Sequence, residues 1–176
     1  MKKLILSVFA LGAVVFGASA ANTASISGSA TLLSQVAIGT SISGHDLTGV
    51  VEGGNLKFGN IGIGTTASVV KVDEETGLRT LTSGDAGLTN TAITPTAAAF
   101  KVTGGANLTY GLTLPASTTM TSGANSLNIS SFAAFSSGTL NASGEDFFSV
   151  GASLAVPSNA VAGAYTGTYT VTVVYN

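Results

Sequence analysis

Short apolar runs with period-two alternation fill the chain after residue 20, and Gly, Ser, Asn and Thr separate them. Apolar residues at alternate positions from Leu108 to Leu114 would share one face of an extended strand. No run carries an apolar stripe of period 3.6, and the longest helical candidate, Ala97–Phe100, is too short. The pattern predicts an all-β antiparallel sandwich or barrel. The other candidate strands lie at 67–72, 78–82, 100–103, 127–132, 147–156 and 165–175.

Two acidic stretches lie next to these runs. Asp73–Gly77 separates two runs and ends in Gly, which predicts a hairpin turn. Calcium binding is the alternative, since Ca²⁺ takes several carboxylate oxygens, but three consecutive acids in a turn do not converge on one ion. Glu145–Asp146 directly precedes the apolar pair Phe147–Phe148 and indicates the turn that enters a strand.

The first twenty residues have the pattern of a secretory signal peptide. Met1–Lys3 is positively charged, Leu4–Gly17 is uncharged, and Ala18–Ala20 supplies the small residues that a signal peptidase accepts. The apolar run is too short for a membrane span, and no later run approaches about 18 apolar residues. A buried amphipathic helix is the alternative, but the run has no polar face. We expect residues 1–20 to be removed and the mature chain to be secreted.

Composition excludes several classes of chemistry. One His and no Cys among 176 residues rule out zinc sites built on thiolates or paired imidazoles, and Cys–His catalysis. Loss of residues 1–20 leaves four basic against eight acidic residues and no basic cluster for nucleic acid. Without disulfides, a secreted domain is stabilised by sheet packing or by assembly. We expect no metal, no cofactor and no nucleic-acid partner.

The remaining motifs favour structural roles over catalysis. His45–Asp46 suggests an acid–base pair, yet a lone His in a Gly/Ser-rich loop is more often solvated. The glycines within Gly59–Gly64 lack the Lys-Ser/Thr of a phosphate-binding loop and indicate turns. No carboxylate pair is positioned as in a glycosidase, so we expect no catalytic residues, and a secreted hydrolase is a distant third interpretation. Asn-x-Ser/Thr triplets begin at Asn107, Asn128 and Asn141, and they arise readily by chance in such a composition.

The last fourteen residues form the clearest predicted strand. Even positions are mostly Thr, whereas odd positions are apolar or small, which gives the strand one apolar face. No partner strand follows Asn176, although an antiparallel sandwich normally pairs such a strand on both sides. The odd-numbered row consists of Gly163, Tyr165, Gly167, Tyr169, Val171, Val173 and Tyr175.

The start of the mature chain has the complementary pattern. From residue 22 to residue 32, even positions are apolar or small and odd positions carry hydroxyl groups. Such a strand can be added to an open sheet edge, where its amides supply affinity and its alternate side chains fill pockets. Gly28 would let two backbones approach closely. The apolar row consists of Ala24, Ile26, Gly28, Ala30 and Leu32.

These two ends resemble the termini of chaperone–usher pilus subunits. The resemblance rests on Gly163, fourteenth from the end, on the alternating apolar row, on the penultimate Tyr175, and on the alternating extension at 22–32. The body, 54–176, resembles a family of secreted bacterial domains of uncharacterised function. Its motifs are LKFG (56–59), AFKVTG (99–104), LTYGLTLP (108–115) and VGASLAVP (150–157), followed by AGAYTGTYTVTVVYN. Many pilus subunits have a disulfide, and this chain has none.

The pilus resemblance implies an immunoglobulin-like sandwich that is incomplete and is completed by a donor strand. It implies a signal peptide at 1–20, a donor-strand extension at 21–36 and a sandwich domain at 37–176. The implied partners are neighbouring copies in a head-to-tail polymer, a periplasmic chaperone and an outer-membrane usher of a Gram-negative-type bacterium. The expected function is therefore that of a fibre subunit at the cell surface, contributing to adhesion or biofilm. The alternative is a self-complete secreted adhesin or carbohydrate-binding module.

Overall fold

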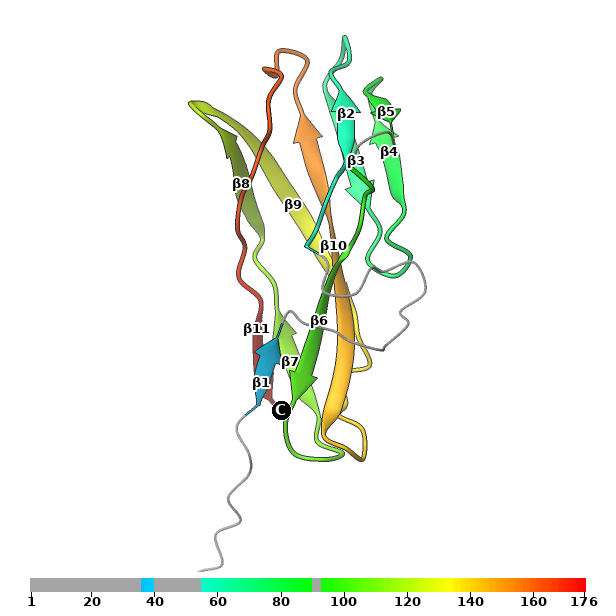
Figure 1. Cartoon of the computed structure of the whole chain (residues 1–176), viewed down its shortest axis with the longest axis vertical. Coiled ribbons are helices and arrows are strands. Elements are labelled where there is room, and N and C mark those ends of the chain that lie inside the picture. Colours follow the sequence, from blue (N-terminus) through cyan, green and yellow to red (C-terminus); the bar gives the residue numbers. More distant parts are fainter. Residues whose placement is uncertain (1–35, 40–54, 90–92) are drawn as a thin grey trace, which may run out of the picture. The chain divides into compact units, whose positions relative to one another are not determined.

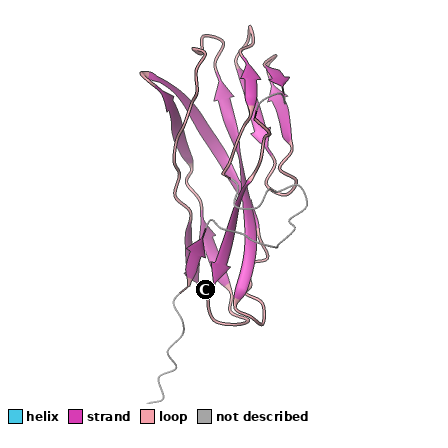
Figure 2. Cartoon of the chain, viewed as in Figure 1, coloured by secondary structure: helices cyan, strands magenta, loops and turns pink. Residues whose placement is uncertain are grey.

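A computed structural model describes residues 36–39, 55–89 and 93–176, all within one compact unit, Ser34–Asn176. These residues form strands and no helix, and all their strand pairs are antiparallel (Figure 1, Figure 2). The prediction of an all-β antiparallel sandwich is thereby confirmed. The signal peptide, the row from Ala24 to Leu32 and His45–Asp46 lie outside the described residues.

The largest sheet is organised around one long strand, β10. One edge of β10 pairs with β6 along Glu145–Val150 and with β3 along Ala152–Val156, while β9 pairs with its other edge. The sheet extends to β1 beyond β6, to β4 beyond β3, and to β8 beyond β9. Its seven strands are β1 (Ala37–Gly39), β3 (Ser68–Val72), β4 (Arg79–Ser83), β6 (Ala98–Thr103), β8 (Ser117–Ser122), β9 (Asn125–Phe135) and β10 (Glu145–Val156).

Both faces of β10 are covered over part of its length. Alternate residues from Phe148 to Val156 face the core and are buried. On the other face, Ser149 is fully buried because the turn after β3 lies over it, and its hydroxyl donates to the carbonyl of Glu74. A side chain at Gly151 would collide with the backbone of the same turn. As a result, every residue from Phe148 to Ala152 is buried, on both faces of β10.

The predicted hairpin at Asp73–Gly77 is confirmed and joins β3 to β4. The Asp73 carboxylate accepts hydrogen bonds from the Thr76 amide at 3.0 Å, the Thr76 hydroxyl at 2.9 Å and the Glu75 amide at 3.2 Å. These bonds, those from Thr76 first, lower the pKa of Asp73 to about 2. Gly77 ends the turn with a φ of 66°, a conformation that favours glycine.

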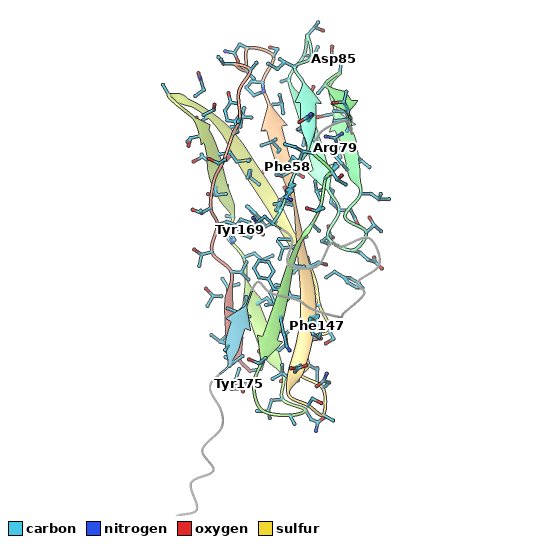
Figure 3. All side chains as sticks on the ribbon, in the orientation of Figure 1. Phe58, Arg79, Asp85, Phe147, Tyr169 and Tyr175 are labelled. Atoms are coloured by element: carbon cyan, nitrogen blue, oxygen red, sulfur yellow. The ribbon has the colours of Figure 1, made fainter. Side chains whose placement is uncertain are left out.

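Two small sheets complete the described structure. In one, β2 (Asn60–Gly62) pairs with β5 (Gly87–Thr89), and in the other, β7 (Tyr110–Thr113) pairs with β11 (Thr172–Tyr175). The Arg79 guanidinium of β4 donates to the carbonyls of Phe58 at 2.7 Å, Asn60 at 2.8 Å and Thr89 at 2.9 Å. These bonds hold the sheet of β2 and β5 against the hairpin (Figure 3).

The apolar core divides into two clusters that meet along β10. The first draws on β3, β9 and the end of β10; the second draws on β6, β7 and the middle of β10, where Phe100 and Phe148 stack at 4.9 Å. The first contains Phe58, Val70, Val72, Ala97, Leu127, Ile129, Ala152, Leu154 and Val156, and the second contains Ala98, Val102, Tyr110, Leu140, Phe148 and Val150. The C-terminal segment packs mainly against the second cluster.

Candidate functional site

The C-terminal segment, residues 163–176, follows β8 and then β7 in the opposite direction (Figure 1). Thr166 and Thr121 exchange backbone hydrogen bonds of 2.8 and 3.0 Å, and β11 then pairs with β7. The predicted strand at 165–175 is therefore a regular strand only over Thr172–Tyr175. The register shifts by two residues between these pairings, where Pro115 separates β7 from β8 and offers no N–H group to a ladder.

The alternation predicted for this segment is confirmed in its burial. The Thr residues at even positions are exposed, whereas the apolar residues at odd positions are half-buried. Gly167 permits a close approach to β8, because a Cβ there would lie 2.5 Å from the carbonyl oxygen of Thr119. Four members of the row, Tyr169, Val171, Val173 and Tyr175, pack against the second core cluster, and Tyr165 packs against the first.

The backbone of the segment has one paired edge and one open edge. A residue in an antiparallel ladder directs its N–H and C=O to the same neighbour, and successive residues alternate. Thr166 and Asn176 bond to β8 and to Thr109, so even-numbered residues face that side and odd-numbered residues face away. Among the described residues, no backbone group pairs with those of Tyr169 or Val171, and Val173, which lies opposite Leu112 in the ladder, directs its N–H and C=O away from β7. We call the backbone side of Tyr169–Val173 that faces away from β7 and β8 the open edge.

β1 lies near β11 and pairs with β6. β1 and β11 come close without forming a ladder among the described residues. Val36, just before β1, is half-buried against the second core cluster, whereas Ile38 is 37% exposed. The edges of β1 and of the C-terminal segment thus border the same apolar cluster.

The two end positions of the row have different roles. The Tyr175 hydroxyl accepts a 2.7 Å hydrogen bond from the Gly105 amide, which fixes the end of β11 to the loop after β6. A side chain at Gly104 would collide with this hydroxyl. Gly163 is exposed in the loop after β10, and a Cβ there would lie 2.5 Å from the Ser122 hydroxyl. Tyr175 is thus an anchor for the strand, and Gly163 permits a close approach to the end of β8.

The pattern did not reveal two groups at this site. One is β1, a strand of three residues with Val36 just before it, where the apolar signal is limited to Val36 and Ile38. The other is Phe132, which lies in a predicted strand and whose ring centroid is 5.0 Å from that of Tyr169. Which side chain of β9 meets Tyr169 depends on the path of two distant strands, so no local pattern encodes it.

The described residues hold no group of three or more acidic or His side chains that could bind a metal ion. Asp146 instead accepts hydrogen bonds from Tyr110 at 2.6 Å and from Ser137 at 2.7 Å, and Glu145 pairs with Lys101. Burial of the Tyr110 hydroxyl, together with its hydrogen bond to the Asp146 carboxylate, raises the pKa of Tyr110 well above its usual value. Within the same residues, no helix has the length and apolar character of a membrane span.

Comparison with known proteins places the chain in a family. A family model described as a domain of unknown function, DUF4402, matches residues 48–175. This range coincides closely with the body, 54–176, for which the sequence resembles an uncharacterised family. No curated protein and no solved structure matches the chain significantly. The chain belongs to the DUF4402 family.

Proposed function

We propose that this protein is the structural subunit of an extracellular fibre, assembled when residues 22–32 of one copy pair with the open edge of the next. The observation that carries the proposal is the open edge itself. The apolar side chains of its odd-numbered residues pack against the second core cluster, while the backbone groups of Tyr169 and Val171 have no backbone partner among the described residues. An exposed edge beside an apolar cluster favours pairing with another chain.

The extension at residues 22–32 suits this edge physically. Its alternating row can direct Ile26 and Leu32 toward the core while its hydroxyl residues face solvent. Full burial of each large side chain would contribute about 1.5–3 kcal/mol, and each new ladder hydrogen bond about 0.5–1.5 kcal/mol. Because head-to-tail pairing is heterologous, it generates an open filament unless the rotation between copies closes a ring.

The proposal includes a route to the cell surface. A secretory signal at 1–20 directs the chain out of the cytoplasm, and an unpaired edge in the periplasm requires protection from aggregation. A periplasmic chaperone would cover the open edge until an outer-membrane usher brings in the next copy. The assembled fibre would serve adhesion or biofilm formation.

Deleting residues 21–32 tests the proposal most directly. We expect the deletion to abolish polymers while the sandwich domain stays folded, because the domain keeps its core and loses only the pairing segment. Sedimentation and detergent-resistant bands on gels measure assembly, and circular dichroism measures folding. Normal filaments from the truncated chain contradict the proposal.

A matched pair of substitutions tests whether residues 22–32 insert as an alternating strand or only tether two copies. Ile26→Asp places a charge on the apolar row and should abolish assembly, because burying an unpaired charge is unfavourable. Ser27→Asp places the same charge on the hydroxyl row and should leave assembly intact. Equal assembly by both variants would show that residues 22–32 do not insert as an alternating strand.

A self-complete carbohydrate-binding module is the second candidate function. The observation in its favour is a hollow of about 520 Å³, whose polar lining includes Ser68, Ser83, Thr119, Ser126 and Asn128. Its lining carries no charge, which suits a neutral polar ligand such as a sugar. A stable monomer at all concentrations that binds glycans would favour this module over the fibre.

A further inference from the structure

Tyr169 carries a buried hydroxyl that has no hydrogen-bond partner among the described residues. Its ring packs on Phe132 and against the second core cluster, and Figure 3 shows it pointing from the C-terminal segment into the space beside β6 and β10. Burial raises the pKa of Tyr169 to about 12, so the hydroxyl is neutral at physiological pH. A buried tyrosine hydroxyl normally finds a partner, and leaving it without one is unfavourable.

The other three tyrosines of the chain all have partners for their hydroxyls. Tyr110 donates to Asp146 at 2.6 Å, Tyr165 donates to the carbonyl of Val161 at 2.7 Å, and Tyr175 accepts from Gly105 at 2.7 Å. The exception is the tyrosine of the open edge. The unsatisfied group therefore lies where the proposed assembly would add a strand.

We propose that Tyr169 is a recognition residue of the open edge, whose hydroxyl gains its missing hydrogen bond from the backbone of residues 22–32 of a second copy. The inference rests on the proposed function and adds a determinant of specificity to it. The core-facing row of the extension is apolar, so its side chains offer no polar partner. The backbone does, most accessibly at Gly28, where no side chain covers it.

This role gives one atom opposite effects in two states. In the unassembled subunit the hydroxyl is buried without a partner among the described residues, which is unfavourable for the fold. In the assembled subunit it is satisfied and stabilises the junction. Removing the hydroxyl should thus favour the lone subunit and weaken assembly, an outcome that a purely structural tyrosine would not produce.

The test compares the mature wild-type chain with Tyr169→Phe and Thr168→Val. Thr168 is the neighbouring residue, its side chain is exposed on the opposite face, and valine removes only its hydroxyl while keeping its shape. Each chain is kept dilute enough to be monomeric by sedimentation. It is then titrated with a labelled synthetic peptide of residues 22–32, and its thermal unfolding is measured without peptide.

We expect Tyr169→Phe to bind the peptide about tenfold more weakly than wild type, which corresponds to about 1.4 kcal/mol. Its melting temperature without peptide should equal or exceed that of wild type, and Thr168→Val should match wild type in both measurements. Wild-type affinity in Tyr169→Phe would overturn the role of the hydroxyl while leaving the proposed function intact. A lower melting temperature in Tyr169→Phe would also overturn it, because the hydroxyl would then have an internal partner. Peptide binding by none of the three chains would overturn the proposed function and this inference together.

Discussion

β10 and the C-terminal segment carry similar alternating apolar rows, but the fold treats them differently. β10 is paired on both edges, and Phe148 and Val150 in its core-facing row are fully buried. Within the described residues, the C-terminal segment is paired only toward β7 and β8, and Tyr169, Val171 and Val173 stay half-buried. The comparison shows that alternation decides which side chains face inward, whereas the elements packed around each row decide how deeply they are buried.

The same comparison explains why the two strands are suited to different roles. β10 is paired on both edges between Ser149 and Leu154, so this stretch is suited to holding the sheet together. The C-terminal segment has backbone groups that pair with none of the described residues, next to half-buried apolar side chains, and a neighbouring strand would pair with the first and cover the second. A strand added there would give the segment the two paired edges that β10 already has.

Truncating the core face of β10 should have the largest effect on stability. We expect Phe148→Ala to lower the free energy of unfolding by about 3–5 kcal/mol, because it removes a fully buried ring that stacks on Phe100. Phe135→Ala on β9 is the matched control, since this ring is 46% exposed, and should cost less than about 1 kcal/mol. Urea unfolding measures the free energy of unfolding of both variants. Similar losses in the two would contradict the difference in burial between Phe148 and Phe135.

A pair of valine truncations makes the comparison quantitative. Val150→Ala should cost about 2 kcal/mol, and Val173→Ala about half of that in the unassembled subunit, since Val173 is only half-buried. When the peptide of residues 22–32 is bound, the loss caused by Val173→Ala should increase toward that of Val150→Ala. If both substitutions lowered the free energy of unfolding equally without peptide, the C-terminal segment would already be covered in the lone subunit.

The smallest expected effect concerns the turn that covers the outer face of β10. The pKa of Asp73 is lowered from 3.8 to about 2, so its contribution to stability is complete above pH 4 and is lost as the pH falls through about 2. Asp73→Asn should therefore be less stable than wild type at pH 7, and the difference should disappear as the pH falls below about 2. Glu75→Gln is the control, because the Glu75 carboxylate has no hydrogen bond or ion pair with the described residues. A difference between wild type and Asp73→Asn that does not depend on pH would contradict this role.

Local signals in the sequence predicted much of this fold. The Asp73–Gly77 turn, the alternation at 108–114 and the odd-numbered row at the C-terminus are each encoded by residues close together in the chain, and the structure has all three. The sequence did not predict that β6 and β3 share one edge of β10, or that β1 pairs with β6. These pairings join segments far apart in the chain, and strand alternation is the same whichever partner a strand has.

By itself, the sequence determined the class of fold, the Asp73–Gly77 turn and the inward-facing row of the C-terminal segment. It did so because the period of a strand and the conformations of turn residues are properties of neighbouring residues. The tertiary structure decided which backbone edges are paired, which is why it located the open edge at Tyr169–Val173. It also decided that Tyr169, unlike the other tyrosines, keeps a buried hydroxyl without a partner among the described residues. Both outcomes depend on distances between strands that only the packed sheet fixes.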